Sequence, residues 1–426
     1  MSRASRRLAT AALLGVIAGI SIGGRAAAQT LLVPMDRSQA NPLKAYGVVY
    51  DALSGGERAE WLLNYRGGSF LVPDLPSVRE RAALAGVDVE PLDGRGLARV
   101  RAEMGEGNRE SVPLDRAPRI AVYTPPTSVP WDDAVTLALE YAGIPYDRVW
   151  DPEVLGGALA DYDWLHLHHE DFTGQYSKFY LSYAGADWLR AEVERNRTTA
   201  ADLGFPDVPA LKKAVARAIR AYVANGGLLF AMCTATETLD LALAADGVDI
   251  AVSFADGDPP DPDADENMHW DETLAFRDAH LVREPGVGAF SDIDGHQVNT
   301  PGRRPLGAFT LFDFSAPIDP VPAMLTQSEV RTLDDFYGLT TSFRRDRLKP
   351  GVTVLAEDRA LGVVKYLHGS YGRGSFTFLG GHDPEDPQHL IGDPPTDLDL
   401  HRRSPGYRLI LNNVLYPAAR KKKLKT

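Results

Sequence analysis

The stretch GGLLFAMCTATET, residues 226–238, is the point from which the fold can be read. Its apolar part, 228–232, fits a buried strand, and the two glycines before it are typical of the end of a preceding helix. A helix-like segment follows at 235–245. Cys233, the single cysteine among 426 residues, therefore lies at a strand-to-helix junction. In an open parallel sheet, this junction faces the edge where ligands bind.

Strand-like and helix-like segments alternate on both sides of this stretch. Short apolar runs are followed by segments whose apolar residues recur at helical spacing. Such alternation predicts the α/β class, with a parallel sheet and helices on both of its faces. The predicted strands are 119–123, 147–150, 164–168, 228–232, 352–356, 362–367 and 375–379, and the predicted helices are 131–142, 152–160, 208–223, 235–245 and 407–415.

The other segments are predicted to form either a small lobe of their own or additions to this sheet. A small N-terminal α/β unit is expected over 29–112, before the main domain at 113–418. Residues 256–272 are acidic and contain prolines, which favours a long surface loop. Residues 289–350 show weak periodicity, so we expect an irregular insertion there. The basic tail at 419–426 is expected to be a solvated chain end.

The first 28 residues have the layout of a secretory signal peptide. Arginines at positions 3, 6 and 7 precede an apolar run, and alanines at 26–28 offer a cleavage site. The sequence therefore predicts an exported protein, periplasmic or extracellular. No later segment approaches the ~18 apolar residues of a membrane span. The formal charge of −13 repels phosphate backbones and argues against a nucleic-acid partner.

Two interpretations of Cys233 follow from its position. Ala231 and Ala235 are small enough for a tight turn around a nucleophile. The helix after the turn would point its positive amino end at the sulfur and stabilise a thiolate. Alternatively, free cysteine is among the most buried residue types and fills space in a core. Position alone does not decide between these interpretations.

A nucleophilic thiol needs a base, and His382 is the candidate. It follows the predicted strand 375–379, so it lies on the same sheet edge as Cys233. His382 would take the thiol proton while Glu385 or Asp383 orients the imidazole. The two glycines before His382 and the carboxylates after it favour a role in a site over an ordinary surface loop.

A second group of polar residues follows the strand 164–168. The segment HLHHED, residues 166–171, holds three histidines and two carboxylates at the sheet's carboxyl edge. These residues fit either a substrate-binding rim or a metal site. The HxxxH and paired CxxC spacings of familiar metal motifs are absent, so no metal is predicted as a cofactor. His382, His389 or His401 would complete such a metal site.

Over roughly residues 119–381, the succession of elements resembles the class I glutamine amidotransferase-like superfamily. Members have a flavodoxin-like sheet, an elbow Gly-x-Cys-x-Gly and a later His-x-Glu motif. Here the elbow reads AMCTA at 231–235, and the second motif reads HDPE at 382–385, one residue longer. The resemblance implies a flavodoxin-like parallel sheet, with Cys233 as nucleophile, His382 as base and Glu385 as the orienting acid.

More closely, the chain is similar to exported bacterial proteins that often carry the label asparagine synthetase B. The similarity rests on LVPMD at 32–36, LLNYRGGSF at 62–70, the Cys233 segment and SPGYRLILNN at 404–413. The label implies an ATP-dependent enzyme with an amino-terminal cysteine nucleophile and an SGG-type ATP loop. This chain has neither feature.

Three functions are compatible with these residues. The first is a Cys-dependent amidase or hydrolase that acts on a C–N or related carbonyl bond of a small-molecule or peptide-like substrate, with Cys233, His382 and Glu385 as catalytic residues. The second is a non-catalytic binding or envelope-associated module that uses the same cleft. The third is a metal-dependent hydrolase centred on the histidine-rich edge. The residues predicted to contact substrate are His168, His169, Glu170, Thr234 and Asp383.

Overall fold

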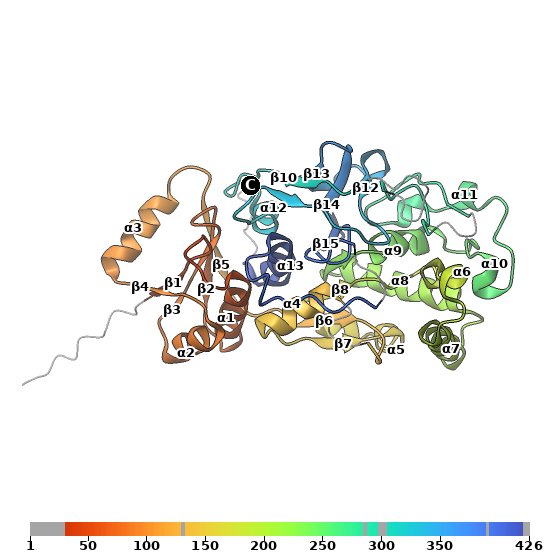
Figure 1. Ribbon diagram of the computed structural model, residues 1–426, viewed down its shortest axis with the longest axis horizontal. Helices are drawn as coiled ribbons and strands as arrows, with labels where there is room; N and C mark the ends of the chain where they lie inside the picture. Colours follow the sequence, from red (N-terminus) through yellow and green to blue (C-terminus); the bar gives the residue numbers. More distant parts are fainter. Residues whose placement is uncertain (1–29, 129–132, 284–287, 297–304, 389–391, 421–426) are drawn as a thin grey trace, which may run out of the picture.

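The computed structural model describes residues 30–128, 133–283, 288–296, 305–388 and 392–420. Two β-sheets run through these residues, and Figure 1 shows the smaller one at one end of the molecule. The predicted signal peptide and most of the predicted basic tail lie outside the described residues. Export and localisation therefore stay predictions from the sequence.

The smaller sheet has strand order β4-β1-β3-β2-β5, and its neighbouring strands are antiparallel. Its first helix begins where the Asn41 side chain accepts a hydrogen bond from Lys44 N, with Pro42 in the first helical turn. The sheet continues to Leu114, two residues past the predicted end of the N-terminal unit at 112. The elements are β1 (Thr30–Val33), α1 (Pro42–Ser54), β2 (Ala59–Leu63), β3 (Ser69–Pro73), α2 (Pro76–Ala85), β4 (Glu90–Leu92), α3 (Gly94–Met104) and β5 (Glu110–Leu114).

The larger sheet has ten strands and is mixed. Five neighbouring strands are parallel in the order β7-β6-β8-β9-β15, and β14, β13, β10 and β11 extend the sheet in antiparallel pairing. The predicted parallel sheet is therefore one part of a mixed sheet. Its strands are β6 (Ile120–Tyr123), β7 (Asp147–Val149), β8 (Trp164–Leu167), β9 (Leu228–Met232), β10 (Ala308–Leu311), β11 (Thr332–Asp334), β12 (Phe343–Arg344), β13 (Thr353–Asp358), β14 (Val363–Tyr371) and β15 (Gly374–Leu379).

Helices cover both faces of the parallel part, as predicted. Along β9, Phe230 and Met232 join the core formed with α4 and α13, whereas Leu229 and Ala231 join the core formed with α8 and α9. Among the described residues, no helix is both long and apolar enough to cross a membrane. The helices are α4 (Ala134–Ala142), α5 (Asp151–Leu155), α6 (Tyr180–Tyr183), α7 (Asp187–Asp202), α8 (Val208–Ala224), α9 (Ala235–Ala244), α10 (Ser253–Asp256), α11 (Ala264–Asn267), α12 (Pro320–Leu325) and α13 (Pro405–Leu415).

The two sheets share one hydrophobic core, with α1 between them (Figure 1). Gly47 of α1 lies against α4, where an added Cβ would come within 1.8 Å of the Ala142 carbonyl oxygen, so a larger residue would force the helices apart. Tyr46 of the same helix donates a hydrogen bond to Asn412 Oδ1 of α13. The N-terminal unit is thus packed against the main sheet through a helix–helix contact.

The segment 289–350, predicted to be irregular, contains regular structure where it is described. It supplies β10, β11, β12 and α12, and β10 and β11 form the outer antiparallel strands of the larger sheet. These strands have two to four residues each, too short for a periodic pattern to show in the sequence. The same segment also passes over the end of β9, which places it at the predicted site.

Candidate metal centre at the carboxyl edge of the sheet

Cys233 forms a tight turn between β9 and α9. Its φ angle is 49°, in the left-handed region that residues other than glycine rarely adopt. Two backbone hydrogen bonds hold the turn: Cys233 N donates to Gly381 O at 3.1 Å, and Ala235 N donates to His168 O at 3.0 Å. The turn is therefore tied directly to both loops that carry the predicted histidines.

The Cys233 thiol is enclosed, with 1% of the residue exposed. Its sulfur accepts a hydrogen bond from Leu339 N at 3.4 Å and lies 3.7 Å from Thr234 Oγ1. A Cβ at Gly338 would come within 3.1 Å of the sulfur, so this loop closes directly over the thiol. Burial raises the pKa of the thiol, although the Leu339 N–H favours the thiolate. Among the described residues, no histidine is hydrogen-bonded to the sulfur.

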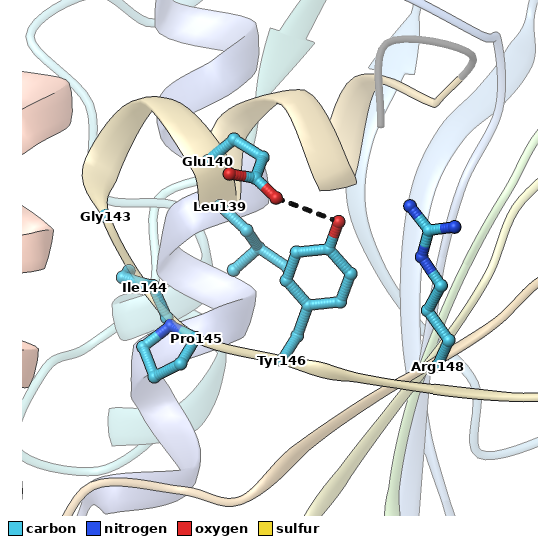
Figure 2. Close-up of a pocket in the computed structure, with 7 residues that line it drawn as sticks. All are labelled: Leu139, Glu140, Gly143, Ile144, Pro145, Tyr146 and Arg148. Atoms are coloured by element: carbon cyan, nitrogen blue, oxygen red, sulfur yellow. Dashed lines mark hydrogen bonds between the residues drawn. The ribbon is translucent and has the colours of Figure 1, made fainter. Parts of the chain in front are cut away.

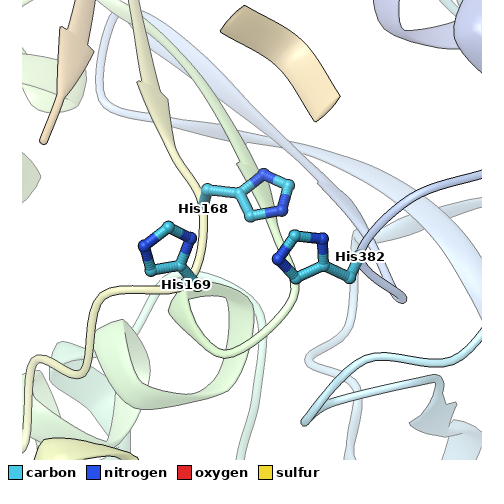
Figure 3. A group of neighbouring side chains, drawn as sticks. All are labelled: His168, His169 and His382. Atoms are coloured by element: carbon cyan, nitrogen blue, oxygen red, sulfur yellow. The ribbon is translucent and has the colours of Figure 1, made fainter. Parts of the chain in front are cut away.

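Three of the predicted histidines meet beyond the ends of β8 and β15. His168 and His169 directly follow β8, and His382 lies in the loop after β15. Because β9 pairs in parallel with both strands, the two loops meet above the Cys233 turn. One nitrogen from each of the three rings lies within 4.8 Å of the other two. Figure 3 shows the three rings side by side. The ring centroids of His168 and His382 are 4.3 Å apart.

A buried carboxylate lies behind His168. Asp133 precedes α4, and its Oδ1 accepts hydrogen bonds from Val135 N at 2.6 Å and Thr136 N at 3.1 Å. The same oxygen is 3.3 Å from His168 Nδ1, and Oδ2 is 3.1 Å from His166 Nε2. Burial alone would raise the pKa of Asp133, but the two histidines hold it well below its ordinary value. Sequence reasoning missed Asp133, although an aspartate at a helix start is a recognisable capping signal.

Glu170 and Thr234, predicted to contact substrate, lie beside this group. Glu170 is buried and accepts a hydrogen bond from His168 N at 3.3 Å. Burial raises the pKa of its carboxyl group. The Thr234 carbonyl accepts a hydrogen bond from Thr238 Oγ1 at 3.0 Å, and the same hydroxyl lies 3.2 Å from the Glu170 carbonyl. Both residues therefore connect the first turn of α9 to the histidine loop.

Asp383 and Glu385 are the two residues predicted to orient His382, and the structure shows the following contacts for them. Asp383 Oδ2 accepts hydrogen bonds from Thr396 Oγ1 at 2.8 Å and from the Tyr407 hydroxyl at 2.9 Å. Glu385 lies nearer the surface, and its Oε2 is 2.7 Å from His401 Nδ1. Asp383 is thus held against α13 through Tyr407, and Glu385 is paired with His401. His389, the other histidine predicted as a possible ligand, lies outside the described residues.

A second buried polar group lies on the other side of the Cys233 turn. Glu237, in the first turn of α9, accepts hydrogen bonds from Ser291 Oγ at 2.6 Å and Thr340 Oγ1 at 2.8 Å. Lys365 forms an ion pair with Asp335 at 2.5 Å, and both side chains are 1% exposed. Three of these residues belong to the segment 289–350, whose weak sequence pattern concealed them. They anchor that segment over the thiol.

A surface pocket of about 460 Å³ lies elsewhere, at the far end of α4 (Figure 2). Asp133 caps the first turn of this helix, whereas the pocket surrounds its last turn and the chain leading into β7. The Tyr146 hydroxyl donates to Glu140 Oε1 at 3.1 Å across it. The pocket is therefore separate from the histidines. It is lined by Leu139, Glu140, Gly143, Ile144, Pro145, Tyr146 and Arg148.

No family model matches the chain, and no curated protein matches it. Among solved structures, the cytoplasmic protein STM1381 from Salmonella typhimurium LT2 is 13% identical with a TM-score of 0.37. The cytoplasmic protein STM3548 from Salmonella typhimurium is 12% identical with a TM-score of 0.35. Each alignment covers 71% of this chain and 100% of the other. Similarity at these TM-scores carries no information about function.

Proposed function

We propose that this protein is a metal-dependent hydrolase whose metal ion is bound by His168, His169 and His382. Zinc is the ion that we propose. The observation that carries the proposal is the convergence of one nitrogen from each ring to within 4.8 Å of the other two. Imidazole nitrogen suits zinc and several other divalent transition metals. Three protein ligands with a fourth position open to water are the usual arrangement in catalytic zinc sites.

The geometry requires a modest closure on metal binding. A tetrahedral zinc ion with Zn–N bonds of about 2.0–2.1 Å holds its ligand nitrogens about 3.3 Å apart. The rings would therefore draw together by up to about 1.5 Å. His168 and His382 are buried and His169 is half-buried, so the bound ion would be largely shielded from solvent. The ionised Asp133 behind His168 would help to balance the charge of the ion.

The position of the histidines supports a catalytic role for the ion. A zinc ion held by these histidines would act as a Lewis acid and would lower the pKa of water at its open position to about 7, which is the chemistry that attack on a carbonyl carbon requires near neutral pH. The strand order β7-β6-β8-β9-β15 supports a flavodoxin-like arrangement, in which ligands bind beyond the carboxyl ends of the strands. The substrate class that fits both features is a small-molecule or peptide-like carbonyl compound.

Isothermal titration of the purified, EDTA-treated protein with zinc tests the proposal. We expect about one zinc ion per chain, and a loss of affinity of at least tenfold in both His169→Ala and His382→Ala. His269→Ala is the matched control, because His269 is an exposed histidine of the segment 256–272 and should leave the affinity unchanged.

Hydrolysis of p-nitrophenyl acetate and a panel of amides, measured with and without zinc, then tests the reaction. Activity that disappears with EDTA, returns with zinc and is lost in the His382 variant supports the proposal. Absence of zinc binding by the wild-type protein would overturn it. Zinc binding without hydrolysis of any substrate in the panel would refute the catalytic part for those substrate classes.

The conformation of Cys233 favours a second candidate, the Cys-dependent amidase or hydrolase. A φ of 49° at a strand-to-helix turn is strained for cysteine, and such strain concentrates at functional sites. His382, in the neighbouring loop, is the available base. This candidate predicts amide hydrolysis that survives EDTA and is abolished in Cys233→Ala, whereas the metal-dependent reaction would survive that substitution.

A further inference from the structure

The contacts behind His168 indicate which nitrogens of the buried histidines carry protons. His166 Nδ1 lies 3.0 Å from the Phe230 carbonyl oxygen. A carbonyl oxygen only accepts hydrogen bonds, so His166 Nδ1 must be the donor. The main chain of β9 therefore determines the protonation of one nitrogen of His166 and holds the plane of its ring.

The same reasoning applies to His168. Its Nδ1 lies 3.3 Å from Asp133 Oδ1 and 3.3 Å from His166 Nε2. A bare lone pair on Nδ1 would face a carboxylate oxygen, which also only accepts, and the two would repel each other. The contact is favourable when Nδ1 carries a proton. The same holds for His166 Nε2, which lies 3.1 Å from Asp133 Oδ2, so each carboxylate oxygen faces one ring N–H. Nε2 of the neutral His168 ring then keeps its lone pair, as a metal ligand requires.

We infer that Asp133 and His166 are positioning residues for the metal centre: Asp133 holds His168 in the tautomer whose Nε2 binds the ion, and His166 holds the orientation of that pair. This inference rests on the proposed function. A carboxylate beside the outer N–H of a metal-bound histidine also makes the ligand nitrogen more basic. Asp133 thus acts on the ion through His168, without touching it.

The backbone makes Asp133 a rigid support. Its Oδ1 is held by the amides of Val135 and Thr136, which opens α4 with an N-terminal cap. The side chain is 9% exposed, so little water competes for its oxygens. Asparagine is an equally good capping residue. Asp133→Asn therefore keeps the helix start and removes the negative charge that faces the two histidines.

Zinc titration of Asp133→Asn provides the test. We expect the dissociation constant for zinc to rise about 10- to 100-fold, with the helix content and melting temperature of the metal-free protein close to the wild type. Asp151→Asn is the matched control, since Asp151 is a buried carboxylate near another helix start, paired with Lys212 at 2.8 Å. That variant should melt earlier and bind zinc as the wild type does.

The outcomes separate this inference from the proposed function. If the wild-type protein binds zinc and Asp133→Asn binds it equally well, the inference fails while the metal centre stands. If the wild-type protein binds no zinc, both fail. Long-range ¹H–¹⁵N correlation spectra of the metal-free wild type give a measurement that needs no folded variant. A His168 ring protonated on Nδ1 supports the inference, and one protonated only on Nε2 overturns it.

Discussion

Replacing Glu237 with glutamine should make the free energy of unfolding less dependent on pH. The carboxyl group is fully buried and accepts hydrogen bonds from Ser291 and Thr340, which join α9 to the segment that covers Cys233. Burial, with a smaller contribution from the negative charge of Asp294, raises the pKa of Glu237 to about 7. Glutamine keeps the shape of the side chain and cannot ionise.

The magnitude follows from the pKa difference between the folded and unfolded chains. The ordinary value is 4.5, so between pH 4.5 and about 7 the unfolded chain releases a proton that the folded protein keeps. The free energy of unfolding therefore falls as the pH rises through this window. At ~1.4 kcal/mol for each pH unit, the wild-type protein loses about 3 kcal/mol. Below pH 4.5 the wild-type protein keeps the whole of this contribution to its free energy of unfolding.

Urea unfolding at pH 5 and pH 8 measures this loss. The free energy of unfolding of Glu237→Gln, relative to that of the wild type, should increase by about 2–3 kcal/mol from pH 5 to pH 8. Comparing the two proteins cancels the titrating groups that do not interact with Glu237. Glu80→Gln, at an exposed glutamate, should show no such change. Parallel pH profiles for Glu237→Gln and the wild type would refute the reasoning.

Three further predictions concern other buried groups. Burial lowers the pKa of His368 to about 4, so below pH 6.5 the unfolded chain binds a proton that the folded protein excludes. In urea unfolding, the free energy of unfolding of the wild type should therefore fall by about 3 kcal/mol from pH 7 to pH 4, and that of His368→Gln should not show this loss. Lys212→Met should cost about 3–5 kcal/mol in thermal unfolding, because Asp151 stays buried without its cation, and a neutral effect would contradict the role of this ion pair. Cys233 should resist iodoacetamide at pH 7 until urea unfolds the protein, as read by mass spectrometry; rapid labelling of the native protein would instead favour the thiol nucleophile.

The alternating part of the fold was predictable because each of its elements leaves a strong local pattern. The strand at 228–232 and the helix at 407–415 are apolar runs of suitable length, and the structure has β9 and α13 there. The helix α7 was not predicted, since among its described side chains only Leu189, Asn196 and Ala200 are buried and the apolar stripe is too sparse. In the antiparallel part, the segments 352–356 and 362–367 were recognisable as strands and correspond to β13 and β14, whereas the outer strands β10 and β11 were missed because they are short.

The site was predictable in its residue types and only partly in its pairings. His168, His169 and His382 were expected on one edge because parallel strands bring their carboxyl ends together. The sequence suggested His382 with Glu385, but the structure places Glu385 with His401. Asp133 reaches the site from α4, a contact between residues 35 positions apart that no local pattern reveals.

Diffraction from zinc-soaked crystals on both sides of the zinc absorption edge would test the central claim most directly. The account predicts an anomalous peak about 2.0–2.1 Å from His168 Nε2 and from one ring nitrogen each of His169 and His382. A zinc peak only elsewhere, or none at these histidines in crystals soaked at a saturating concentration, would contradict it.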